Sequence, residues 1–167
     1  MERYDVAIIG AGPGGVACAI KAAEYGLSYV LLEKGSNVFQ GIIDSYPRGK
    51  KVYPTIPRGE SGPFPIADLA PEDTNEPVEE YLEKIRRCVE EKQIQIRFRE
   101  EFKDIRQGKE GVTVKTRDTR YRAANVVLAF GNNIPVDLGV YGEAKIVARK
   151  LDNGGSPRRS NPGSRRW

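Results

Sequence analysis

The residues of this chain whose types and spacing could do chemistry stand near its start, in YDVAIIGAGPGGVACAIKAAEYGLSYVLLEKG, residues 4–35. Gly10, Gly12 and Gly15 follow an apolar run and open a segment with helical periodicity. In this spacing the first glycine permits a tight turn, the second lets backbone approach a pyrophosphate, and the third lets helix and strand pack closely. The spacing therefore predicts a loop that binds the diphosphate of a dinucleotide.

Glu33 is the second candidate, because it ends the next apolar run about 20 residues beyond the first glycine. A carboxylate at the end of the second strand can accept hydrogen bonds from both hydroxyls of an adenosine ribose, and it would repel a 2′-phosphate. The N–H groups and the helix dipole over residues 13–16 favour the negative phosphates. These residues predict FAD or NAD as the ligand and disfavour NADP. The alternative interpretation of Glu33 is a solvated acid at a strand end.

The elements that must position these residues follow from the apolar pattern. The runs at 5–10 and 28–33 are typical of buried parallel strands. The segment from Pro13 to Tyr25 has helical spacing, and Gly26 is expected to end the helix. Together these segments predict a βαβ unit.

The second half of the chain predicts a helix followed by short strands. Residues 77–93 predict an amphipathic helix that begins at a proline, and residues 94–98 a strand. Three short segments within 101–124 predict an antiparallel meander, and 125–131 predicts a further buried strand. The apolar face of the helix is expected to carry Val78, Leu82, Ile85 and Val89.

Residues 35–77 lose the apolar periodicity and are rich in glycine and proline. So long a segment without regular structure is either functional or disordered. Its many apolar side chains favour an ordered segment that packs over the rest of the chain.

The motif GAGPGG followed by LLEK resembles the FAD-binding start of flavoproteins with two dinucleotide-binding domains. These are the pyridine nucleotide-disulfide oxidoreductases and thioredoxin reductase-like enzymes. The meander followed by VVLAFG is similar to the family's return segment, with Phe130 where threonine is usual, and SYPRGKKVYPTIP is most similar to the bacillithiol-reductase-like branch. The resemblance covers roughly residues 4 to 150. It implies an α/β fold, a Rossmann-like three-layer FAD-binding domain with an antiparallel β-meander.

The resemblance also implies the cofactor and its contacts. FAD would be the cofactor, and NAD(P)H the electron donor of the complete enzymes. The glycine loop would hold the pyrophosphate, Glu33 with Lys34 the ribose, and the backbone of Phe102 the adenine edge. No catalytic acid, base or nucleophile is identified, and a chain without histidine or a CxxC pair offers no metal site. The cofactor-binding candidates are Gly10, Ala11, Gly12, Pro13, Gly14, Gly15, Glu33, Lys34, Phe102, Ala129 and Gly131.

The sequence departs from the family toward its end. In the family a nicotinamide-binding domain with its own glycine motif follows, and a C-terminal Gly-Asp segment completes the FAD domain; neither motif occurs here. We therefore expect an incomplete FAD-binding domain over 1–150 and a disordered basic tail over 151–167, as in a truncated, frameshifted or excised chain. A sheet without its later strands exposes an edge and an apolar face, so homo-oligomerisation or partial disorder is expected.

The charge of the chain argues against a nucleic-acid partner. The four arginines of residues 154–167 account for the whole excess of 27 basic over 23 acidic residues, so the body is neutral and no specific nucleic-acid binding is expected. No apolar run is long enough to span a bilayer and no signal peptide is evident, so a cytoplasmic protein without membrane contact is expected. A dinucleotide is the expected small-molecule partner. Beside the FAD-binding portion of an NAD(P)H-linked oxidoreductase, two alternatives stay open: an NAD-binding module without flavin, and a non-enzymatic fragment with a basic interaction tail.

Overall fold

The computed structural model describes residues 2–53, 66–71 and 75–131. The expected tail over 151–167 and the last part of the expected domain, 132–150, lie outside the described residues.

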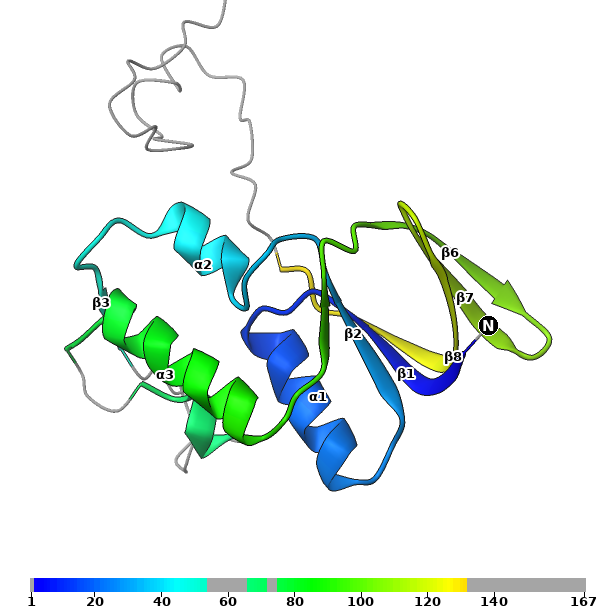
Figure 1. Ribbon diagram of the computed structural model, residues 1–167, viewed down its shortest axis with the longest axis horizontal. Coiled ribbons are helices and arrows are strands. Elements are labelled where there is room, and N and C mark those ends of the chain that lie inside the picture. The colour runs from blue at the N-terminus through cyan, green and yellow to red at the C-terminus, as the bar shows by residue number, and fades with distance from the viewer. Residues whose placement is uncertain (1, 54–65, 72–74, 132–167) are drawn as a thin grey trace, which may run out of the picture. The chain divides into compact units, whose positions relative to one another are not determined.

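A six-stranded sheet with the order β5-β2-β1-β8-β7-β6 forms the centre of the described part (Figure 1). The strands β5, β2, β1 and β8 are parallel to one another, so residues that follow their carboxyl ends gather at one edge. The hairpin β6–β7 continues the sheet by antiparallel pairing with β8. The strands are β1 (Arg3–Ile9), β2 (Tyr29–Glu33), β5 (Ile96–Phe98), β6 (Phe102–Gly108), β7 (Gly111–Thr116) and β8 (Arg120–Leu128).

The predicted βαβ unit is confirmed. Helix α1 (Pro13–Glu24) joins β1 to β2 and has its proline in the first turn, where a missing N–H leaves no helical acceptor unpaired. Gly26 has φ 66° and donates its N–H to the carbonyl of Ala23. This left-handed conformation suits glycine and ends the helix.

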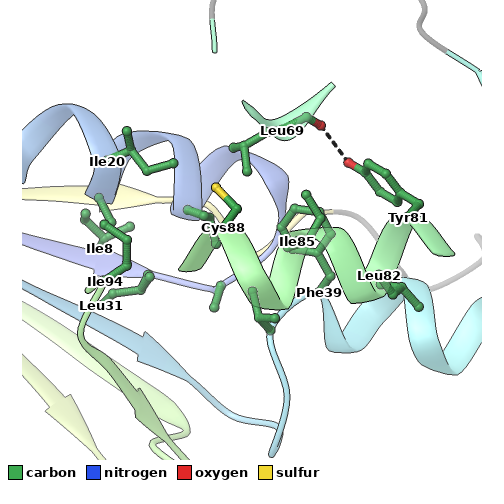
Figure 2. Packing of buried hydrophobic residues seen from close by; sticks show 14 of the residues in the cluster. Ile8, Ile20, Leu31, Phe39, Leu69, Tyr81, Leu82, Ile85, Cys88 and Ile94 are labelled. Carbon is green, nitrogen blue, oxygen red and sulfur yellow. Dashed lines mark hydrogen bonds between the residues drawn. The ribbon is translucent and has the colours of Figure 1, made fainter. Parts of the chain in front are cut away.

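Helix α3 (Val78–Glu91) packs beside α1 over one face of the parallel strands, where a continuous apolar cluster forms (Figure 2). The predicted helix is confirmed, but its buried face is rotated. Tyr81 and Cys88 are buried while Val89 is only partly buried. The Tyr81 hydroxyl donates to the carbonyl of Leu69, 2.9 Å away, which satisfies the polar end of a buried ring.

A second apolar cluster covers the opposite face of the sheet. This cluster packs the meander against the parallel strands. The meander is thus the third layer, after the helices and the parallel strands. The α/β, Rossmann-like arrangement with a β-meander is therefore confirmed. The buried members of this second cluster are Ala7, Ile9, Val30, Leu32, Val114, Tyr121 and Ala123.

Strand β8 corrects the sequence prediction, which divided it into a meander strand and a separate buried strand. One strand runs through both segments, and it pairs with β7 from Arg120 to Ala123 and with β1 from Arg122 to Leu128. Ala123 lies between Val112 of β7 and Tyr4 of β1, whereas Asn125 lies opposite Val6 of β1 alone among the described residues. The expected burial is wrong at Leu128, which is 56% exposed, because among the described residues the second half of β8 pairs only with β1.

The segment 35–77 is more regular than the sequence predicted. Its described parts include two short helical elements and a small two-stranded sheet, and Phe39 within it is fully buried. Residues 54–65 and 72–74 lie outside the described part. Across the described residues, no helix has both the length and the apolar character needed to cross a membrane. The elements are α2 (Gln40–Ser45), β3 (Lys51–Val52), η1 (Ala67–Leu69) and β4 (Glu76–Pro77).

Candidate dinucleotide-binding site

Hydrogen bonds to the N–H and to the carbonyl of Ala11 hold the loop between β1 and α1 in place. The Ala11 N–H donates to Oε2 of Glu33 at 2.8 Å, and the Ala11 carbonyl accepts from the N–H of Phe39 at 2.9 Å. One residue earlier, the Gly10 N–H donates to the carbonyl of Leu32 at 2.8 Å. The end of β2 and the segment after it therefore fix the position of the glycine loop.

Glu33 is a buried acid, with 6% of its surface exposed, so it is not a solvated side chain at a strand end. Its Oε1 accepts the N–H of Gly35 at 2.7 Å, while Oε2 accepts the N–H of Ala11. Hydrogen bonds from N–H groups to an ionised carboxylate are among the stronger ones in proteins. Each oxygen keeps a second lone pair, which can accept a ribose hydroxyl.

The glycines of the loop fall into two kinds. Gly10 has φ 102°, and a Cβ built on it would lie 2.7 Å from the carbonyl oxygen of Ala129. A Cβ on Gly15 would lie 1.8 Å from the carbonyl oxygen of Gly10. These two positions exclude a side chain because neighbouring backbone fills the space.

Gly12 and Gly14 border open space instead. A Cβ built on either residue meets no heavy atom within 4 Å. The protein therefore leaves room at the outer side of the loop, and that room suits a group such as a pyrophosphate, which must approach backbone N–H groups closely.

The first turn of α1 faces the same open space. Gly12 is its N-cap and makes no side-chain cap hydrogen bond, and the first turn carries no acid. The first helical bond runs from the N–H of Val16 to the carbonyl of Gly12. The earlier N–H groups have no helical acceptor, and the helix dipole adds partial positive charge there. The arrangement favours an anion.

Strand β8 brings its end to the loop. The Ala129 N–H donates to the carbonyl of Ile9 at 2.8 Å, and the Ala129 carbonyl approaches Gly10 as described. Gly131 has φ 67°, a left-handed conformation that favours glycine. Phe130, where the family usually has threonine, is 57% exposed. Ala129 is thus assembled with the glycine loop.

Lys34 and Phe102 are related to the candidate site through their neighbours in the sequence. Lys34 is exposed and follows Glu33 at the end of β2. The ring of Phe102 packs against the second apolar cluster, on the face opposite α1. Its link to the site is Glu100, two residues earlier, whose N–H donates to the carbonyl of Glu33 at 2.9 Å.

Three residues of the site were not identified from the sequence. Gly35 excludes a side chain because a Cβ there would lie 2.5 Å from Cγ of Gln40; a glycine two residues after the acid was the available signal. Phe39 has φ 56°, which is unusual for a bulky residue, and no local pattern indicates it. Glu100 is brought in by tertiary pairing alone.

The arrangement can bind and orient a dinucleotide. Within the described ranges, no group of three or more His, Cys, Asp or Glu residues could hold a metal ion. Cys88 is buried and unpaired, and burial raises the pKa of its thiol, which keeps it protonated.

A family profile described as pyridine nucleotide-disulphide oxidoreductase matches residues 7–156. Bacillithiol disulfide reductase from Bacillus cereus superposes with a TM-score of 0.69 and 28% identity, over 85% of this chain and 44% of that one. Thioredoxin reductase from T. acidophilum gives 0.60 and 22%, over 88% and 41%, which shows the common fold.

Sequence relatives match over short stretches of this chain. A vinyl phenol reductase from Lactiplantibacillus plantarum is 42% identical over 53 residues, which is 27% of this chain and 11% of that protein. A dihydrolipoyl dehydrogenase from Mycobacterium tuberculosis is 54% identical over 33 residues, 20% and 7% of the two chains. This chain thus spans less than half the length of the proteins that it matches. The chain belongs to the pyridine nucleotide-disulphide oxidoreductase family, FAD-dependent enzymes with NAD(P)H as electron donor, and it corresponds to their FAD-binding portion.

Proposed function

We propose that this chain binds FAD by its adenosine diphosphate half and serves an NAD(P)H-linked oxidoreductase. The observation that carries the proposal is the open space at Gly12 and Gly14, next to the uncapped first turn of α1. Glu33 is hydrogen-bonded to the same loop through Ala11. A diphosphate site and a ribose-binding carboxylate thus adjoin each other.

Each candidate residue has a role in this proposal. The loop of residues 10–15 holds the pyrophosphate, and Glu33 with Lys34 meets the ribose. Gly10 and Ala11 already donate their N–H groups within the protein and Pro13 has none, so the donors to the pyrophosphate are the N–H groups of Gly12, Gly14 and Gly15. The backbone of Phe102 meets the adenine edge, supported by its nearness in sequence to Glu100, which bonds to Glu33. Ala129 and Gly131 line the pocket beside the loop.

The division of labour follows from these roles. FAD, when bound, supplies the electron-transfer chemistry. The protein residues bind the diphosphate with N–H groups, orient the ribose with a carboxylate, and leave open space at Gly12 and Gly14 where the cofactor approaches. The proposal includes a cytoplasmic location and association of chains into a homo-oligomer.

The adenosine half of the proposal can be tested with ADP and with ADP phosphorylated at the 2′ position. Because the proposed contact with the ribose would put the Glu33 carboxylate next to a 2′-phosphate and repel it, we expect ADP to bind at least about tenfold more tightly. Isothermal titration of the full chain measures both affinities. Equal affinities, or binding of neither compound, would contradict the proposal.

A further inference from the structure

A hydrogen-bonded pair fastens the meander to the parallel strands close to the candidate site. The Tyr121 hydroxyl, on β8, donates to Oε1 of Glu100 at 2.8 Å. Tyr121 is 7% exposed and belongs to the second apolar cluster. Loss of water around the ring, followed by the bond to Glu100, raises the pKa of Tyr121 to about 12, so the hydroxyl remains a donor at neutral pH.

The backbone beside this pair grips the segment that carries Glu33. The Glu100 N–H donates to the carbonyl of Glu33, and the Arg99 N–H donates to the carbonyl of Gly35, each at 2.9 Å. Gly35 in turn donates its N–H to the Glu33 carboxylate. A shift of residues 99–100 would therefore move the peptide groups from which the carboxylate is held.

We propose that Glu100 and Tyr121 are positioning residues for the ribose-binding carboxylate of Glu33. Tyr121 fixes the side chain of Glu100, and the backbone of Glu100 fixes the end of β2. The carboxylate of Glu33 is thereby aimed at the glycine loop. The inference rests on the proposed function, in which Glu33 binds the ribose.

One oxygen of the Glu100 carboxylate, and not the other, is held by a hydrogen bond among the described residues. Oε2 is buried and has no hydrogen-bond partner among the described residues. A buried acceptor left unpaired weakens a fold. The position of the Glu100 side chain therefore depends on the bond that Oε1 accepts from Tyr121, and an amide of the same shape would still accept that bond.

The test compares binding of ADP with binding of 2′-deoxy-ADP to the full chain. The wild-type protein should prefer ADP about tenfold, since the deoxy compound lacks one hydroxyl that Glu33 accepts. In Tyr121→Phe and Glu100→Ala this preference should fall toward one, while the affinity for 2′-deoxy-ADP stays unchanged. Glu100→Gln should retain the preference, because its amide oxygen still accepts from Tyr121.

Val112→Ala is the matched control for stability. Val112 is buried in the meander, and it pairs with Ala123 rather than with Tyr121. This variant should lower the melting temperature and leave the preference for ADP intact. If Val112→Ala abolishes the preference as strongly as Tyr121→Phe, a general loss of stability explains the effect and the inference is wrong.

Two further results separate the inference from the proposed function. If the wild-type protein prefers ADP and both Tyr121→Phe and Glu100→Ala keep that preference, the positioning role is overturned and the proposed function stands. If the wild-type protein binds ADP and 2′-deoxy-ADP equally, the ribose role of Glu33 is overturned, and the inference falls with it.

Discussion

Glu33 accepts a hydrogen bond from the backbone N–H of Ala11, with 2.8 Å between its Oε2 and the nitrogen. This bond joins the last residue of β2 to the loop that leaves β1. The diphosphate site and the ribose site of the proposed cofactor are therefore parts of one connected structure, and substitutions on either side should affect both binding and stability.

Glu33→Gln should weaken both the binding of ADP and the stability of the fold. The amide replaces one carboxylate oxygen by a donor, so either Ala11 or Gly35 loses its acceptor. We expect the free energy of unfolding to fall by about 1–3 kcal/mol and ADP affinity to fall about tenfold. Urea unfolding and titration calorimetry measure the two effects. Glu90→Gln, on the exposed face of α3, should change neither; unchanged ADP affinity in Glu33→Gln would refute the role.

Gly12→Ala should impair ADP binding, whereas Gly15→Ala should impair folding. A Cβ at Gly12 meets open space and its φ of −78° suits alanine, so the melting temperature should hold while ADP binding falls about tenfold or more. A Cβ at Gly15 meets the Gly10 carbonyl at 1.8 Å, so the fold itself should be lost or weakened by several kcal/mol. Circular dichroism with calorimetry distinguishes the two. Full ADP affinity in a folded Gly12→Ala would place the diphosphate elsewhere.

Stability should fall at alkaline pH because of two buried tyrosines. Burial, then the charge of Glu76, raises the pKa of Tyr81 to about 12, and burial, then Glu100, does the same for Tyr121. In the unfolded chain the value is near 10.0, so their stabilisation is complete below pH 10.0 and is lost as the pH rises through about 12.

Urea unfolding at about pH 8 and about pH 11 should record this loss, and Tyr81→Phe or Tyr121→Phe should reduce it. Tyr25→Phe is the control, because Tyr25 is 77% exposed. If Tyr25→Phe reduces the pH dependence of stability as much as Tyr81→Phe and Tyr121→Phe do, the loss of stability at alkaline pH does not come from the two buried tyrosines.

The open half of β8 should make chains associate. Among described residues, the backbone after Ala123 in β8 pairs only with β1, and Leu128 is 56% exposed. Such an edge with apolar side chains favours contact with another chain. Light scattering should report an oligomer that Leu128→Lys reduces and that Leu27→Lys, at another exposed leucine, leaves in place. A wild-type monomer with a sharp cooperative melt would contradict the expectation.

The βαβ unit was predictable because its determinants are local. Gly10 and Gly15 have to be glycines for reasons of backbone space, and Gly26 for its left-handed conformation. The apolar runs on either side of the helix supply the buried strands of the sheet.

The rest depended on contacts between distant residues. The sequence between Ala123 and Asn125 carries no turn signal, and only the two neighbouring strands show that the pairing of β8 with β7 ends there while its pairing with β1 continues. The left-handed Phe39 is held by packing, with its ring 6.1 Å from that of Tyr81. Helix α2 has six residues, too few for apolar periodicity to predict it.

The most direct test of the account is the visible spectrum of the purified chain as FAD is added. We predict that the flavin band shifts on binding and that this shift saturates at equimolar FAD. Addition of ADP should reverse the shift, because ADP competes for the glycine loop. A flavin spectrum that stays identical to that of free FAD, with no competition by ADP, would contradict the claim that residues 10–15 and Glu33 form the binding site of the cofactor.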